Sequence, residues 1–254
     1  MTGFQLGRIA ILKQELSKQE ALAEAKKILR DLPRIESVYI HTGRVSGELR
    51  VPRVRYVAGQ RDPVTTYREN GCLYKLDVTK VMFSKGNLLE RGRLTRFVNP
   101  GETIVDMFAG IGYFSIPLAK SQASKIYSIE LNRDSFRFLK ENIRLNNAQA
   151  RIIPIQGDCR KVRIPEKADR ILMGYLPGTD KFLPAAFRLL KPRGMIHYHD
   201  VFKKAELWEK PESVLKEHGE KAGFRLERIH NTRVVKTFSP GVYHIAIDAE
   251  FRKA

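Results

Sequence analysis

A turn containing two glycines follows an apolar stretch that predicts a β-strand near residue 105. The stretch ends in Asp106, and Gly110 and Gly112 allow the backbone to turn closely against a ligand before a helix begins. A dinucleotide-binding fingerprint requires a third glycine where Ser115 stands, so the pattern disfavours NAD. A carboxylate at this turn suits a cationic ligand better than a pyrophosphate, which favours the sulfonium and amino group of S-adenosylmethionine.

Two further acidic residues close the next two predicted strands. Glu130 ends the second strand, where its carboxylate can accept hydrogen bonds from both hydroxyls of a ribose. Asp158 ends the third strand, with Cys159 beside it, and is placed to accept a hydrogen bond from an adenine amino group. Each acid taken singly is more often a surface or capping carboxylate. Because both stand at the end of a strand, as Asp106 does, we interpret the three together as a nucleoside-binding site.

The chain from about Pro100 onward alternates between strand-like and helix-like segments. This rhythm predicts βαβ units and a parallel sheet that binds ligands beyond the carboxyl ends of its strands. The last two strand-like segments flank Ser239-Pro240-Gly241 and predict an antiparallel hairpin at the edge of the sheet. Strands are expected at residues 103–108, 125–131, 151–158, 168–176, 194–200, 225–235 and 242–251, and helices at 115–121, 135–146, 182–190 and 212–222.

The residues before this region predict a smaller unit of mixed structure. Residues 18–32 carry apolar side chains at helical spacing, and Pro33 supplies a stop. β-Branched and polar residues alternate over 37–59, and Asn70-Gly71 between two strand-like runs is a strong hairpin signal. We therefore expect a small α+β N-terminal domain at residues 1–78 and a Rossmann-like α/β catalytic domain at residues 79–254.

The composition favours nucleic acid as a partner. Of the 254 residues, 46 are Lys or Arg and 28 are Asp or Glu, which gives a formal net charge of +18. This excess of positive charge attracts polyanions. The alternative is a basic surface that is only solvated, or charge-rich as in a thermophile, and binds no nucleic acid. Cys72 and Cys159 are too few for a zinc cluster or a disulfide framework and indicate a reducing compartment. No segment is long and apolar enough to span a bilayer, so we expect a cytoplasmic protein without membrane contact.

Three motifs resemble one family of tRNA-modifying enzymes. They are Val81–Asn87 with Glu90-Arg91, the turn region 105–120, and residues 141–147. The turn region and the acids at the strand ends are similar to those of the class I S-adenosylmethionine-dependent methyltransferases. With the other motifs, they resemble the archaeal and eukaryotic family that comprises the tRNA guanine-N1 methyltransferase and the wybutosine-pathway aminocarboxypropyltransferase. The resemblance implies the Rossmann-like class I methyltransferase fold.

The residues at the fourth predicted strand resemble one branch of that family more than the other. The methyltransferase branch usually carries Asn-Leu-Pro there, whereas this chain has Met173-Gly174-Tyr175. This form resembles the aminocarboxypropyltransferase branch, as do residues 41–52, 197–199 and 239–248. The resemblance implies transfer of the 3-amino-3-carboxypropyl group of S-adenosylmethionine to C7 of 4-demethylwyosine at position 37 of tRNA(Phe). The by-product would be methylthioadenosine.

The same resemblance implies a set of cofactor contacts. The residues expected to bind the cofactor are Ser84, Arg91, Phe108, Gly110, Glu130, Asp158, Cys159 and Gly174. Arg91 is expected to hold the methionyl carboxylate or to steer the substrate, and Tyr175 beside Gly174 can stack on a base. All three carbons on a sulfonium are electrophilic, so orientation selects the transferred group, and we assign no catalytic base.

Two other functions remain open at this point. A tRNA guanine-37 N1-methyltransferase would leave S-adenosylhomocysteine, and a non-catalytic RNA-binding protein would keep the fold without the cofactor. A metal site at His197, His199 and Asp200 is disfavoured, because we expect the two histidines to face opposite sides of the sheet. Basic runs at 91–96, 160–163 and 203–204 can position phosphates. We expect no metal and no obligate protein partner.

Overall fold

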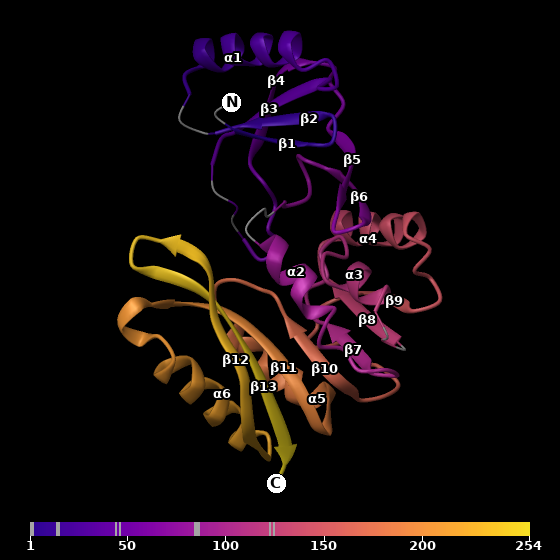
Figure 1. Cartoon of the computed structure of the whole chain (residues 1–254), viewed down its shortest axis with the longest axis vertical. Coiled ribbons are helices and arrows are strands. Elements are labelled where there is room, and N and C mark those ends of the chain that lie inside the picture. Colours follow the sequence, from indigo (N-terminus) through magenta and orange to yellow (C-terminus); the bar gives the residue numbers. More distant parts are fainter. Residues whose placement is uncertain are drawn as a thin grey trace.

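The computed structural model describes residues 3–13, 16–43, 45, 47–83, 87–121, 123 and 125–254. Within these ranges the strands form three sheets of four, two and seven strands. The N-terminal half, with α1 at its outer end, is stacked on the C-terminal half along the long axis of the molecule (Figure 1). In the same ranges, no helix is both long and apolar enough to cross a membrane.

The N-terminal half is a four-stranded sheet with the order β1-β2-β3-β4, covered on one face by α1. A capping box begins α1: Ser17 Oγ accepts a hydrogen bond from Glu20 N, and Glu20 accepts one from Ser17 N. The sequence predicted α1 but not the first two strands. The elements are β1 (Gly3–Leu6), β2 (Ile9–Leu12), α1 (Lys18–Asp31), β3 (Ser37–His41) and β4 (Val54–Gly59).

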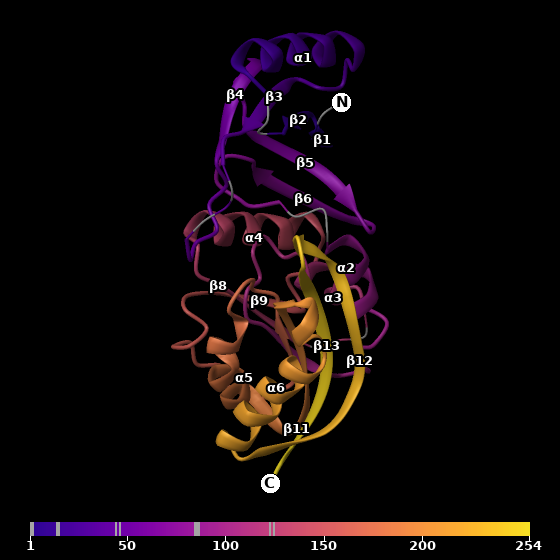
Figure 2. The same ribbon diagram turned by 90° about the vertical axis from the view of Figure 1, so that its left-hand side faces the viewer.

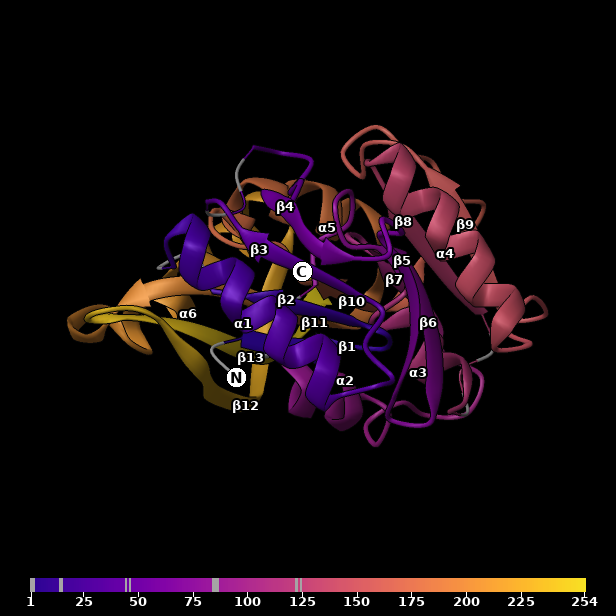
Figure 3. The same cartoon turned by 90° about the horizontal axis from the view of Figure 1, so that it is seen from above.

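A two-stranded hairpin, β5 (Val64–Glu69) with β6 (Cys72–Asp77), connects the halves. Asn70 and Gly71 form its turn with φ angles of 47° and 72°, the positive values that a two-residue type I′ turn requires. The hairpin lies between the small sheet and α4 (Figures 2 and 3). The sequence signal for this hairpin is therefore confirmed.

The C-terminal half is a sheet with the order β12-β13-β11-β10-β7-β8-β9. Neighbours from β11 to β9 are parallel, whereas β13 runs antiparallel to β11 and β12 forms the outer edge. The predicted Rossmann-like sheet with an antiparallel C-terminal hairpin is confirmed. The elements are α2 (Leu88–Leu94), β7 (Thr103–Asp106), α3 (Ser115–Ala119), β8 (Lys125–Glu130), α4 (Arg133–Leu145), β9 (Ile152–Gln156), β10 (Ala168–Met173), a 3-10 helix (Thr179–Phe182), α5 (Leu183–Leu189), β11 (Leu190–Lys203), a 3-10 helix (Lys204–Glu206), α6 (Glu209–Lys221), β12 (Phe224–Ser239) and β13 (Val242–Lys253).

The core lies on both faces of this sheet. On one face, α5 and α6 contribute Leu183, Phe187 and Leu215 to a buried apolar cluster. On the other face, side chains of α3 and α4 pack in a cluster that continues through the β5–β6 hairpin to Ile9 and Ile11 of the small sheet. The two halves of the chain therefore share a continuous core.

Candidate functional site

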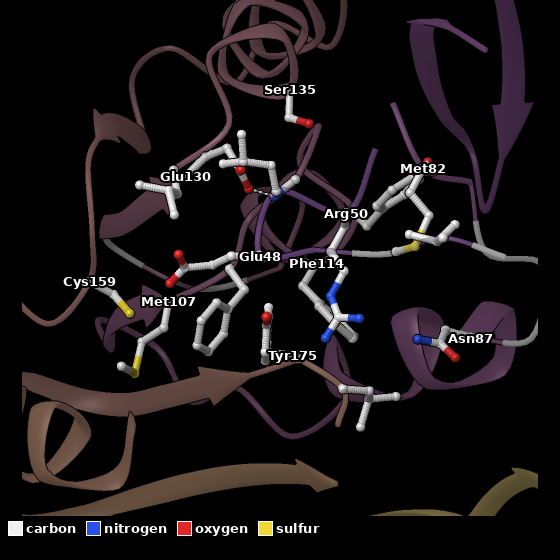
Figure 4. A pocket seen from close by; sticks show the side chains of 18 of the residues that line it. Glu48, Arg50, Met82, Asn87, Met107, Phe114, Glu130, Ser135, Cys159 and Tyr175 are labelled. Carbon is white, nitrogen blue, oxygen red and sulfur yellow. Dashed lines mark hydrogen bonds between the residues drawn. The ribbon is translucent and has the colours of Figure 1, made fainter. Parts of the chain in front are cut away.

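A cavity of about 490 Å³ opens at the carboxyl ends of the parallel strands, within the usual range for small-molecule sites. Its walls come from the turns after β7, β8, β9 and β10, from residues 48–50, and from the β12 strand. Figure 4 shows Glu48, Glu130 and Tyr175 among the lining residues. The predicted residues that line it are Arg91, Phe108, Gly110, Glu130, Asp158, Cys159 and Gly174. Ser84 lies outside the described residues. The structure thus brings together the other predicted contacts.

Glu130 fixes the glycine turn as well as lining the cavity. Its Oε2 accepts a hydrogen bond from Gly110 N at 2.7 Å (Figure 4), and its Oε1 accepts one from Asn132 N at 2.7 Å. Burial raises the pKa of Glu130 to about 7. Gly112 has a φ of 99°, and a Cβ there would lie 2.6 Å from the Ile116 side chain, so the turn requires glycine.

Asp106 does not face the cavity, which corrects the expectation that it attracts a cationic ligand. The carboxyl group is fully buried, and its Oδ2 accepts a hydrogen bond from Ser115 Oγ at 2.7 Å. The hydroxyl of Ser115 in turn accepts a hydrogen bond from Ser128 Oγ at 2.7 Å. Burial raises the pKa of Asp106 to about 6. Asp106 and Ser115 therefore hold the start of α3 against β8.

Asp158 and Cys159 line the cavity at the end of β9. The carboxylate of Asp158 accepts hydrogen bonds from the Arg160 side chain at 2.7 to 3.0 Å, which lowers the pKa of Asp158. The same guanidinium donates to Glu48 at 2.9 Å. Burial raises the pKa of the Cys159 thiol to about 12. The thiol is therefore uncharged, and its small side chain lines the cavity without adding charge.

Arg91 is buried rather than exposed to phosphates. Its Nη1 donates to both oxygens of Glu69 at 2.8 and 3.0 Å, and its guanidinium carbon lies 3.8 Å from the centroid of the Tyr113 ring. Arg93 is also withdrawn from the surface, in ion pairs with Glu90 and Asp248. The expectation that the basic run at 91–96 positions phosphates is therefore wrong for Arg91 and Arg93.

The structure also corrects the expected placement of two histidines. His197 and His199 face the same side of the sheet, because alternate residues of a strand share a face. His197 Nδ1 lies 2.5 Å from Asp248, and its Nε2 lies 2.6 Å from Arg170. His199 Nδ1 lies 3.0 Å from His244 Nε2.

Asp200 on β11 faces the opposite side of the sheet from both histidines. Its carboxylate accepts hydrogen bonds from Gly178 N, Thr179 N and the Tyr198 hydroxyl at 2.8 to 3.0 Å. Among the described residues, no group of three or more His, Cys, Asp or Glu is arranged to hold a metal ion. His197, His199 and Asp200 are therefore each hydrogen-bonded to other groups of the fold.

Several cavity residues had no local sequence signal. Glu48, Leu49 and Arg50 reach the cavity from the segment between β3 and β4, and Lys236 and Phe238 reach it from β12. Residues 48–50 belonged to a stretch with family resemblance and Lys236 and Phe238 did not, and no pattern in either segment predicted a place in the site. The cavity is therefore built from parts of the chain more than 100 residues apart.

The strand order and the ligand-sized cavity at the strand ends define a Rossmann-like protein of the class I S-adenosylmethionine-dependent methyltransferase fold. The TRM5/TYW2 methyltransferase domain matches residues 65–227. The chain belongs to this TRM5/TYW2 family.

Relatives from both branches of the family are similar to this chain. The tRNA(Phe) (4-demethylwyosine(37)-C(7)) aminocarboxypropyltransferase of Methanocaldococcus jannaschii is 41% identical, over 98% of this chain and 97% of that protein. The tRNA (guanine(37)-N(1))-methyltransferase Trm5b of Pyrococcus abyssi is 34% identical, over 96% and 72%. The crystal structure of M. jannaschii TYW2 in complex with AdoMet matches with a TM-score of 0.81 at 36% identity, covering 99% of this chain and 100% of that chain.

Proposed function

We propose that this protein transfers the 3-amino-3-carboxypropyl group of S-adenosylmethionine to C7 of 4-demethylwyosine at position 37 of tRNA(Phe). The observation that carries the proposal is the 41% identity to the M. jannaschii aminocarboxypropyltransferase over nearly the whole of both chains. Met173-Gly174-Tyr175 in place of Asn-Leu-Pro supports the same branch. The net charge of +18 suits a tRNA partner.

The cavity fits S-adenosylmethionine in size and in chemistry. A volume of about 490 Å³ accommodates a ligand of this class, and the lining combines carboxylates and basic side chains with apolar ones. A Cβ at position 174 would lie 3.0 Å from the Phe114 ring, so glycine keeps this part of the cavity open. Glu130 already accepts backbone hydrogen bonds and retains lone pairs for ribose hydroxyls.

We assign the following contacts within the cavity. Glu130 binds the ribose, Asp158 accepts from the adenine amino group, and Arg91 holds the methionyl carboxylate. Phe108, Gly110, Cys159 and Gly174 form the walls. Ser84 belongs to the same proposed set, although it lies outside the described residues. A cytoplasmic location and the lack of an obligate protein partner also stay predictions.

Orientation is the main task of these residues in the proposed reaction. S-adenosylmethionine supplies a γ-carbon that takes the electron pair of C7 while the bond from that carbon to sulfur breaks and its electrons stay on sulfur, giving methylthioadenosine. The proton on C7 can leave after the new bond forms, so the chain need not supply a strong base. Residues around the methionyl arm must hold the γ-carbon, rather than the methyl group, toward the base.

The by-product identifies the reaction directly. We expect methylthioadenosine when the protein is incubated with S-adenosylmethionine and tRNA(Phe) bearing 4-demethylwyosine, with detection by chromatography and mass spectrometry. Transfer RNA with unmodified guanosine-37 is the control and should give no by-product. S-adenosylhomocysteine from either tRNA would overturn the proposal in favour of a methyltransferase. No product together with no S-adenosylmethionine binding in calorimetry would indicate a non-catalytic RNA-binding protein.

A further inference from the structure

A four-residue turn of the N-terminal half, residues 47–50, reaches the cavity. Arg50 N donates a hydrogen bond to Gly47 O at 3.3 Å across the turn. Glu48 and Leu49 at its centre line the cavity, and Figure 4 shows the Glu48 side chain there. Gly47 and Arg50 have φ angles of 74° and 52°, and this left-handed conformation is disfavoured at Arg50 because the residue has a Cβ. The turn therefore depends on contacts with the rest of the protein to keep its place.

Asn132 connects this turn to the carboxylate that we assign to the ribose. Its Nδ2 donates a hydrogen bond to the Leu49 carbonyl at 3.0 Å, and its backbone N donates one to Glu130 Oε1 at 2.7 Å. Its Oδ1 accepts hydrogen bonds from Asp134 N and Ser135 N, so the side chain is also fixed as the N-cap of α4. One anchor of the turn is therefore a residue that the fold holds firmly in place.

Arg160 connects the same turn to the carboxylate that we assign to the adenine. Its Nη2 donates a hydrogen bond to Glu48 Oε1 at 2.9 Å and another to Asp158 Oδ2 at 2.7 Å. The side chains of Arg160 and Glu48 are 46% and 52% exposed, so their ion pair lies on the solvent side of the turn. Exposed ion pairs contribute little and break readily. The second anchor is therefore one that thermal motion can open.

We infer that residues 47–50 form a clasp over the nucleoside end of the cavity, which must open for S-adenosylmethionine to enter and for the nucleoside by-product to leave. Each anchor of the turn also hydrogen-bonds one of the two acids that we assign to the nucleoside, so the turn covers a ligand held by Glu130 and Asp158. Both anchors join protein groups and involve no ligand atom. Opening of the clasp therefore limits entry and exit alike. This inference rests on the proposed function, which supplies the identity of the two ligands.

The test loosens each anchor and measures how fast S-adenosylmethionine and methylthioadenosine bind and leave, by surface plasmon resonance on the immobilised full chain. Asn132→Ser removes the donor to Leu49 and keeps a good N-cap for α4, whereas Glu48→Ala removes the acceptor of Arg160. We expect the association and dissociation rate constants to rise together, by about twofold to fivefold in Glu48→Ala and about twofold to tenfold in Asn132→Ser, with Kd within about twofold of the wild type. Glu217→Ala is the matched control and should change neither rate constant, because it removes an exposed glutamate from an ion pair on α6, away from the cavity.

Two outcomes would overturn the inference. Faster dissociation with an unchanged association rate constant would show that the turn only contacts the ligand, in a cavity that is always open. Rate constants equal to those of the wild type in both variants would show that the turn does not limit passage. Failure of the proposed function is distinguishable, because the wild type would then release S-adenosylhomocysteine or bind neither ligand. A failed clasp instead leaves wild-type binding intact and removes only the difference between the wild type and the two variants.

Discussion

Burial controls the protonation of two carboxyl groups at the turn after β7. The pKa of Glu130 is raised to about 7 and that of Asp106 to about 6, in both cases mainly because the charged form loses solvation. The two groups nevertheless have different surroundings. Asp106 is enclosed by Ser115, whereas Glu130 lines the cavity and can exchange its lost solvation for a ligand's hydroxyl groups. Ligand binding should therefore favour the ionised form of Glu130.

This difference predicts a pH dependence of cofactor binding. If S-adenosylmethionine binds the ionised form of Glu130, its affinity rises as pH increases through about 7, by about tenfold between pH 6 and pH 8. Glu130→Gln should weaken binding by about 10-fold to 100-fold at pH 8 and flatten this dependence. Calorimetry at several pH values checks both effects. A pH slope that persists between pH 6 and pH 8 in Glu130→Gln would assign the titration to another group.

The site residues that could be predicted from sequence are those that stand at, or just after, the end of a strand. Glu130 and Asp158 fall in the cavity because parallel strands end at one edge of the sheet, a rule that needs no knowledge of distant contacts. Arg50 and Phe238 could not be predicted in the same way, because tertiary packing alone brings their segments to that edge. The misplacement of His199 had a simpler cause, since the period of two along a strand was misapplied.

At the scale of elements, buried ion pairs fasten α2 to the C-terminal hairpin. Arg93 on α2 donates to Glu90 on the same helix and to Asp248 on β13, at 2.5 to 3.2 Å. Arg233 on β12 also contacts Glu90. These inward-facing charges explain why the sequence did not predict α2: its buried face includes Glu90 and Arg91, so the usual apolar periodicity is missing.

Removal of one partner from this cluster should be strongly destabilising. We expect Arg93→Met to lower the free energy of unfolding by about 3 kcal/mol, because Asp248 and Glu90 keep their charges in a buried site. Urea denaturation of the full chain measures the change. Lys221→Ala is the control, because its pair with Glu217 is exposed to solvent and its loss should leave the free energy of unfolding nearly unchanged. A comparable loss in both variants would mean that burial does not set the energy of these pairs.

At the scale of the whole molecule, we propose that residues 1–78 and 79–254 are two domains joined by an extensive interface. The β5–β6 hairpin of the first is seated on α4 of the second (Figure 2). The side-chain amides of Asn142 and Asn146 bond the backbone of Lys75 and Leu73 at 2.7 to 3.1 Å. Glu69 at the end of β5 neutralises Arg91 near the cavity. The first domain therefore covers α4 of the second domain and supplies the carboxylate that pairs with the buried Arg91.

This interface predicts a sharp difference between two truncated chains. A chain of residues 79–254 loses Glu69 together with the hairpin that helps to bury Arg91, so it loses both the ion pair and the packing of the hairpin on α4. A chain of residues 64–254 keeps the hairpin and this ion pair. We expect calorimetric unfolding temperatures to fall in the order full chain, 64–254, 79–254, with the larger drop at the second step. Glu69→Gln in the full chain separates the ion pair from the packing, because it removes the charge and keeps the hairpin. If the two truncated chains unfolded within about 2 °C of each other, the hairpin would be a passive connector and the catalytic domain would be stable without it.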